Sequence, residues 1–200
     1  MVKASTRRRG RPPETSHDEI RDIALKLFCE QGYARTSLAG IAEAAGISRT
    51  TLFTYFPSKR DMIWVDHDRR RADIDRALAQ GPAHPVVDLI MRGLLAGASY
   101  TIAEHDVLAT RWRIVENEDE LRAYRALADQ EMTRQIARSS ADRAPGADAH
   151  LITLVTRALS AAASVSIGEW AAQQSPTADL YAHISTEIQP IVDALRPLLP

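Results

Sequence analysis

Residues 36–55 contain two short helical patterns separated by a glycine, and this arrangement constrains the fold more than any other part of the sequence. The first pattern ends at Gly46; the second follows Ser48, a residue type that caps helices, and ends near Tyr55. Glycine readily adopts the left-handed backbone that a tight turn between helices needs. The arrangement predicts a helix-turn-helix, whose second helix can enter the major groove of DNA. The apolar residues that can lock the two helices together are Ile41, Ala42, Ala45, Ile47 and Leu52.

Helical periodicity extends to both sides of this motif. Before it, Ser16-x-x-Glu19 is a capping box that begins a helix, and Gly32 ends that helix. After it, Ser58-x-x-Asp61 is expected to begin a long helix that reaches about Ala79. Further helices are expected near residues 85–104, 106–116, 118–141, 148–173 and 178–196. With no strand signals, we expect an all-α fold: an N-terminal three-helix helix-turn-helix domain plus a C-terminal helical ligand-binding and dimerisation domain.

Charge is distributed unevenly along the chain. Residues 1–65 hold 11 Lys/Arg against 7 Asp/Glu, whereas residues 66–200 hold 14 against 19. A basic front and an acidic back suit a head that binds a polyanion, joined to a body with another role. We therefore expect a flexible basic arm over residues 1–15, a DNA-binding domain over 16–65 and a ligand-binding and dimerisation domain over 66–200.

The basic arm contains the run Arg9-Gly10-Arg11-Pro12. A narrow cationic ribbon of this kind is typical of arms that enter A·T-rich minor grooves, so we expect Arg9 and Arg11 to contact DNA. The alternative is a disordered tail that only aids solubility.

The polar face of the second short helix carries the residue types that read DNA. Arginine is the common bidentate reader of guanine, which favours Arg49 as a base contact, and Thr50 can touch base edges or thymine methyls. Other side chains are better suited to holding phosphates: Ser48, Thr51, Tyr55 and Lys59.

One long run of this sequence closely resembles the N-terminal domain of TetR-family regulators, over about residues 16–65. The matching residues are Gly32-Tyr33-x-x-Thr36-Ser37-x-x-x-Ile41-Ala42-x-x-Ala45-Gly46-Ile47-Ser48-x-x-Thr51-Leu52-Phe53-x-Tyr55-Phe56-x-Ser58-Lys59. The resemblance implies DNA contacts at Thr36, Ser48, Arg49, Thr50, Thr51, Tyr55 and Lys59. Phe53 departs from the tyrosine usual in the family, so a phosphate contact of that hydroxyl is missing, and a packing role is expected to remain.

The last two helices of the body are the expected dimer interface. A single helix-turn-helix touches few bases, and two copies about one DNA turn apart give useful specificity. The pattern over 148–173 is apolar nearly all round, and such a helix must be buried on several sides. The TetR resemblance likewise implies a homodimer through the last two helices. The alternative is an intramolecular core alone.

A regulator of this kind also needs an input, and the resemblance implies a pocket for a small-molecule effector in the body. The middle helices carry aromatic, apolar and polar side chains that could line one, although such residues are more often plain core. The candidate ligand-binding residues are Met91, Leu95, Ser99, Arg111, Trp112, Val115, Tyr124 and Trp170.

A finer resemblance, to the subgroup of mycofactocin-system regulators, is carried by residues at both ends of the DNA-binding domain. These are Gly10-Arg11-Pro12-Pro13-x-Thr15-Ser16-His17, Phe56-Pro57-Ser58-Lys59 and Trp64-x-Asp66. This resemblance implies an acyl-CoA-type effector. The expected function is therefore a sequence-specific repressor released from a palindromic operator by a small hydrophobic effector.

Other classes of function lack their motifs. Neither Asp66-His67-Asp68 nor Glu104-His105-Asp106 has metal-ligand spacing on a helix, so both are expected to be solvated, with no metal, no cofactor and no catalytic residue. No apolar run reaches the roughly 18 residues that a membrane segment needs, so we expect none. A single cysteine fits a reducing cytoplasm. The alternative that remains is a non-specific architectural DNA-binding protein without a ligand, while a helical enzyme would need a cluster of perturbed acids or histidines.

Overall fold

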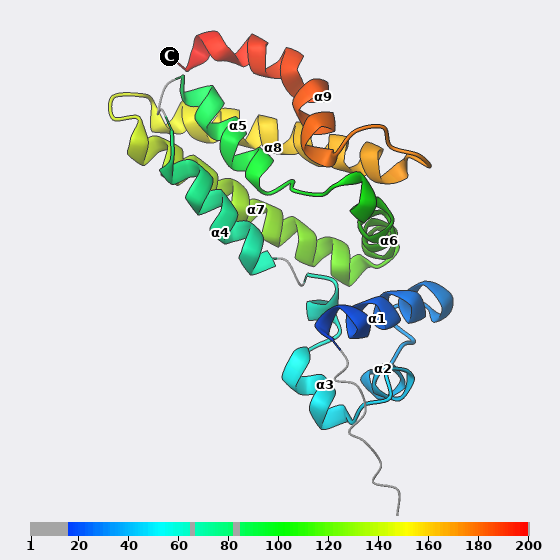
Figure 1. Ribbon diagram of the computed structural model, residues 1–200. Coiled ribbons are helices and arrows are strands. Elements are labelled where there is room, and N and C mark those ends of the chain that lie inside the picture. The colour runs from blue at the N-terminus through cyan, green and yellow to red at the C-terminus, as the bar shows by residue number, and fades with distance from the viewer. Residues whose placement is uncertain (1–15, 65–66, 82–84, 200) are drawn as a thin grey trace, which may run out of the picture. The chain divides into compact units, whose positions relative to one another are not determined.

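The computed structural model describes residues 16–64, 67–81 and 85–199, without the side chains of residues 67 and 68 (Figure 1). The described residues form helices and no strand. The chain divides after Ile63 into two compact units. The helices are α1 (His17–Gln31), α2 (Leu38–Ala44), α3 (Arg49–Tyr55), α4 (His67–Ala79), α5 (Val86–Ala96), α6 (His105–Glu116), α7 (Asp119–Arg143), α8 (Ala149–Ala172) and α9 (Leu180–Leu195), with 3-10 turns η1 (Arg60–Met62), η2 (Ile102–Glu104) and η3 (Arg196–Leu198).

Local capping signals set the boundaries of the first unit. The Ser16 Oγ accepts from the Glu19 amide at 3.1 Å while the Glu19 carboxylate accepts from the Ser16 amide at 2.8 Å, so the predicted capping box begins α1. At the end of α2, Gly46 has φ +67°, its amide donates to Glu43 O, and the Ile47 amide donates to Ala42 O. This pair of bonds is a Schellman motif, which ends a helix and turns the chain. The core of the unit is apolar and consists mainly of Ile20, Phe28, Ile41, Leu52 and Phe56.

The helix expected to run from Ser58 to about Ala79 is wrong in its first part. The Ser58 hydroxyl donates to the Asp61 carboxylate at 2.7 Å, but this local pair opens only the short turn η1. The long helix α4 begins at His67, after the two residues that lie outside the described part of the chain.

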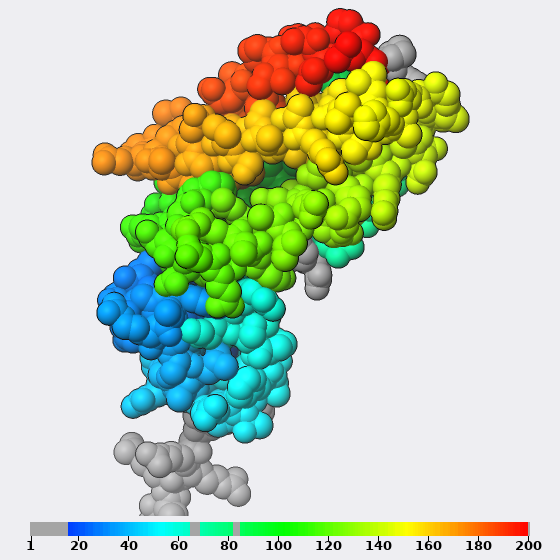
Figure 2. Space-filling view, turned by 180° about the vertical axis from the view of Figure 1, so that it is seen from behind, coloured from blue at the N-terminus to red at the C-terminus, as the bar shows by residue number. Residues whose placement is uncertain are grey.

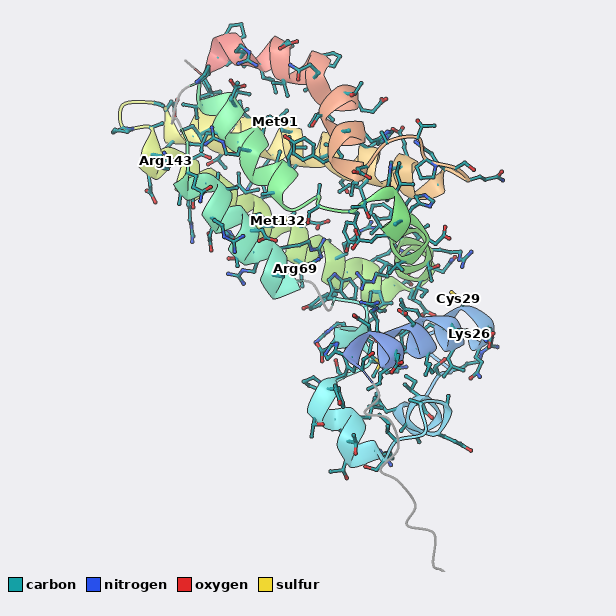
Figure 3. All side chains as sticks on the ribbon, in the orientation of Figure 1. Lys26, Cys29, Arg69, Met91, Met132 and Arg143 are labelled. Atoms are coloured by element: carbon teal, nitrogen blue, oxygen red, sulfur yellow. The ribbon has the colours of Figure 1, made fainter. Side chains whose placement is uncertain are left out.

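In the second unit, α5 is the central helix. It packs against α4, α7, α8 and α9, and most of its residues are buried. Gly93 permits the closest approach, because a Cβ there would lie 3.0 Å from Leu78 Cδ2 and 3.2 Å from Ile136 Cγ2. Arg143 at the end of α7 closes the C-terminal end of α4, donating to the carbonyl oxygens of Leu78 and Gly81 (Figure 3). These bonds satisfy carbonyl groups that a helix end leaves without partners.

The helix expected over 85–104 is also wrong in length, because it ends at Ala96. The following segment bonds to the beginning of α9 instead of continuing the helix. The Leu180 amide donates to Tyr100 O at 3.0 Å, and the Ile102 amide donates to the Asp179 carboxylate at 2.7 Å. These partners lie nearly 80 residues away, and helical periodicity does not report on them.

Helix α8 has a buried face and an open face. Among the described residues, α8 is the one helix that is long and apolar enough to cross a membrane, although no segment of that length was expected. Core helices of soluble proteins pass the same test of length and composition. In this unit, α8 packs against α5, α6, α7 and α9, which accounts for its buried face without a membrane.

Candidate DNA interface and effector site

Helix α3 presents a polar face whose hydroxyl groups serve the helix itself. The Ser48 Oγ caps α3 by accepting from the Thr51 amide at 3.0 Å, and it lies 2.8 Å from the Thr51 Oγ1. The Thr54 hydroxyl donates to the Thr51 carbonyl oxygen at 2.6 Å. All three side chains are exposed, as are those of Arg49 and Thr50. The structure therefore brings Ser48, Arg49, Thr50 and Thr51 onto one open helix, as a DNA-reading surface requires.

Two residues expected to contact DNA have internal roles. Thr36 is 2% exposed, and its hydroxyl donates to Gly32 O at 2.9 Å, so it supports the turn after α1. The Lys59 ammonium donates to Tyr33 O at 2.8 Å and Thr36 O at 2.9 Å, and lies 4.3 Å from the centre of the Tyr33 ring. Lys59 also does not begin a long helix, so the expected helix N-terminus at this position is missing. The DNA contacts expected of Thr36 and Lys59 stay predictions, and the Lys59 ammonium bonds to residues more than 20 positions away.

The remaining expected DNA contacts divide between the end of α3 and the basic arm. Tyr55 is half-buried, with its ring 5.9 Å from the His17 ring in an edge-on arrangement. Packing against α1 thus restricts the tyrosine, as suits a residue that positions a phosphate. Arg9 and Arg11 lie outside the described residues.

The body contains a buried polar group between α6 and its neighbours. Arg111 is 6% exposed, and its guanidinium donates to the Tyr100 hydroxyl at 3.1 Å. His105, expected to be solvated, is 5% exposed; its Nε2 donates to the Trp170 carbonyl oxygen at 3.0 Å. The His105 ring also lies edge-on to the Trp170 indole, 4.7 Å between centres. The expectation for His105 was wrong because α8 covers this face of α6, which the local sequence does not reveal.

The eight expected effector residues are only partly gathered. Met91, Leu95 and Trp170 belong to one apolar core, and Arg111 and Val115 are buried. Trp112 is half-buried beneath the Arg125 guanidinium, at 4.5 Å, and close to Gly168. By contrast, Ser99 is exposed, and the Tyr124 ring packs 4.8 Å from the Trp64 ring. Tyr100 and His105 are buried near Arg111 as well, although neither was among the expected effector residues. Their position between apolar runs is the one sequence signal that indicates burial.

A separate shallow hollow, open to solvent, lies between α4 and α7. None of the expected effector residues lines it. Its walls are formed by Trp64, Arg70, Arg71, Ala128, Asp129, Glu131 and Met132. Figure 3 shows Met132 on α7 beside α4, apart from Met91 on α5.

The open face of α8 carries an apolar stripe, with the exposed Arg157 and Glu169 beside it. Leu154 is 48% exposed and Val165 63% exposed, and the alanines at 158 and 161 lie between them on the same side. Spacings of four, three and four residues form the narrow stripe that packs in helix bundles. On α9, Tyr181 and Ile191 are also exposed. Figure 2 shows α8 and α9 side by side on one face of the body.

Comparison with known proteins identifies the family. Residues 20–63 match the family model described as bacterial regulatory proteins of the TetR family. Residues 84–196, more than half of the chain, match the model described as the MftR C-terminal domain. The chain belongs to the TetR family. The expected fold class and the expected resemblance to mycofactocin-system regulators are confirmed, and the family to which the chain belongs is one of bacterial regulatory proteins.

Individual relatives agree with this assignment. The TetR-family chain is 33% identical over 116 residues to MftR of Mycobacterium tuberculosis, a regulator named for mycofactocin biosynthesis. That match spans 58% of this chain and 59% of the relative, which is less than two thirds of its length. Among solved structures, FadR from Bacillus halodurans has a TM-score of 0.57 at 17% identity, covering 92% of this chain and all of that one. FadR from Thermus thermophilus, described in complex with lauroyl-CoA, has a TM-score of 0.52 at 24% identity, covering 90% and 95%. These structural likenesses establish the shared fold.

Proposed function

We propose that this TetR-family regulator is a homodimeric repressor that a small hydrophobic effector releases from a palindromic operator. The observation that carries the proposal is the buried Arg111–Tyr100 pair inside the apolar body. A purely architectural DNA-binding protein has no use for a guanidinium placed in a core, because burying a charge is costly unless a polar group offsets it.

The open apolar stripe of α8 and the exposed apolar residues of α9 support the homodimer. A stripe that contains Leu154 and Val165 has an unfavourable contact with water, which a second copy of the same stripe removes. A two-fold axis pairs each stripe with its equivalent, and this symmetry matches the two half-sites of a palindrome.

The proposed effector combines an apolar body with a polar or anionic head. The apolar part would pack among core residues such as Met91, Leu95 and Trp170, and Arg111 would face the head. Arginine suits this role because its planar fork recognises carboxylate and phosphate oxygens. An acyl-CoA fits this description, and the T. thermophilus FadR structure holds lauroyl-CoA.

Release from DNA follows from two conformations of the dimer that differ in the spacing of their heads. An effector lowers operator affinity only if it binds better to the conformation whose heads miss the half-sites. The affinity of the protein for effector must then fall by the same factor when operator is bound.

The experiment begins with selection of genomic DNA fragments by the purified protein at near-physiological salt. Enrichment of a short palindrome supports the repressor, whereas uniform recovery of fragments supports the architectural alternative. Fluorescence anisotropy with the selected operator then tests release by lauroyl-CoA and by free laurate. An Arg111→Met variant should keep operator affinity but lose at least tenfold in sensitivity to the effector. Tight ligand binding that leaves operator affinity unchanged would refute the mechanism.

A further inference from the structure

Phe53 is an aromatic side chain that α3 leaves open to solvent. Its ring is 45% exposed, whereas the neighbouring Leu52 is completely buried in the core of the first unit. The expected packing role can therefore involve only part of the ring surface. The exposed part of the ring contributes no hydrophobic stabilisation to the seven-residue helix, because it stays in contact with water after folding.

The surroundings of Phe53 place it within the DNA-reading face. Phe53 lies one helical turn after Arg49 and three residues after Thr50, and residues at these spacings are neighbours on a helix surface. Both neighbouring side chains are exposed. The three side chains together form a continuous outward surface of one cation, one hydroxyl and one aromatic ring.

The hydroxyl groups on either side of this surface already have partners within α3. The Ser48 Oγ accepts from the Thr51 amide, and the Thr54 hydroxyl donates to the Thr51 carbonyl oxygen. Arg49, Thr50 and Phe53 thus remain as the outward groups best placed to read bases. A phenyl ring has no donor or acceptor, so its reading of a base pair must be apolar.

The major groove offers one apolar group, the C5-methyl of thymine. We propose that Phe53 is a specificity-determining residue that selects thymine at one position of each operator half-site by packing on this methyl. The inference rests on the proposed function, because it needs α3 to enter the major groove of a specific site. It goes beyond it by naming a base and the residue that reads it.

The test is a scan in which each thymine of the selected operator is replaced by deoxyuridine, symmetrically in both half-sites. This replacement removes only the methyl group and keeps the Watson–Crick pairing and every hydrogen-bonding group in the groove. Burial of one methyl predicts a loss of about fourfold per half-site, and about 15-fold for the symmetric change. Anisotropy titrations at fixed salt measure the affinities.

The Phe53→Ala variant should bind the thymine operator more weakly and should lose the methyl dependence at that one position. Phe53→Leu should keep part of the dependence because it retains an apolar side chain. Thr54→Ala, the matched control one residue along, should keep all of it. Circular dichroism melting curves check that each variant folds, which the exposure of both side chains favours.

The outcomes separate this inference from the proposed function. Specific binding to a palindrome without methyl dependence at any thymine overturns the role of Phe53 and leaves the repressor intact. Equal methyl dependence in Phe53→Ala and the unmodified protein also overturns it. Failure of the protein to select any DNA sequence overturns both.

Discussion

Replacing Val165 with glutamate should separate the proposed dimer into single chains. Val165 is the last residue of the open stripe of α8 and is 63% exposed in the single chain. Any partner that covers the stripe must therefore bury most of this side chain. Glutamate favours helix formation at least as well as valine, so the change should leave α8 itself intact.

The size of the effect follows from the surface that the partner covers. Complete burial of a valine side chain contributes roughly 1.5–3 kcal/mol, so covering the exposed two thirds contributes about 1–2 kcal/mol per subunit. Two-fold symmetry doubles this to about 2–4 kcal/mol, and every 1.4 kcal/mol changes Kd by tenfold. The dissociation constant of the dimer should therefore rise roughly 30- to 1,000-fold, before any cost of burying two carboxylates is added.

Sedimentation equilibrium over a range of protein concentrations measures this change directly. The matched control is Leu127→Glu, because Leu127 is 65% exposed on α7 and lies outside the stripe. The control should sediment as the unmodified dimer. Operator affinity should fall for Val165→Glu and stay the same for the control, because only paired heads engage both half-sites.

Three results would refute the reasoning. An unmodified protein that is monomeric at micromolar concentration removes the dimer altogether. Equal dissociation constants for Val165→Glu and the unmodified protein would mean that the stripe lies outside the interface. Dissociation by the control alone would place the interface on α7.

Three further predictions concern the internal contacts of each unit. Gly46→Ala should lower the free energy of unfolding by about 1–2 kcal/mol in urea titrations, because Gly46 has φ +67°. The cause is the backbone alone, since no atom lies within 4 Å of the added Cβ. The control Gly40→Ala, inside α2, should raise the free energy of unfolding by about 0.5–1 kcal/mol. Gly168→Ala should lower the free energy of unfolding by about 1–3 kcal/mol and change the tryptophan emission, because the added Cβ would lie 2.9 Å from a carbon of the Trp112 indole. An unchanged melting temperature would contradict this packing. Lys59→Ala should lower the melting temperature and have only a small effect on DNA affinity, measured at a temperature where the variant is fully folded. Arg49→Ala should lower DNA affinity and have only a small effect on the melting temperature. A weaker salt dependence of DNA binding in Lys59→Ala would show that Lys59 contacts phosphate.

Much of the DNA-binding unit could be predicted from the sequence because its signals are local. The capping box of Ser16, the Schellman turn at Gly46 and the Ser48 cap each join residues no more than five positions apart. Such bonds depend on side-chain type and spacing, which the sequence displays directly. The positions of α1, α2 and α3 followed from them.

Predictions failed where a local signal competed with a distant partner. Ser58 and Asp61 form their expected hydrogen bond, yet the chain there makes only the turn η1. Helix α5 ends early because the segment after it bonds to the beginning of α9. Hydrophobic periodicity could not distinguish a continued helix from a turn at these places, since an apolar residue can be buried in either.

The sequence alone determined the all-α class, the helix-turn-helix and the family resemblance, because each depends on residue types at short, regular spacing. Only the tertiary structure decided which candidate side chains face outward. Within the first unit, Thr36 is buried and the Lys59 ammonium bonds to backbone carbonyl groups. His105 is buried beneath α8, and Phe53 is exposed on α3. The physical reason is clearest for Lys59 and His105, whose hydrogen-bond partners lie 23 to 65 residues away and approach through the packing of whole helices.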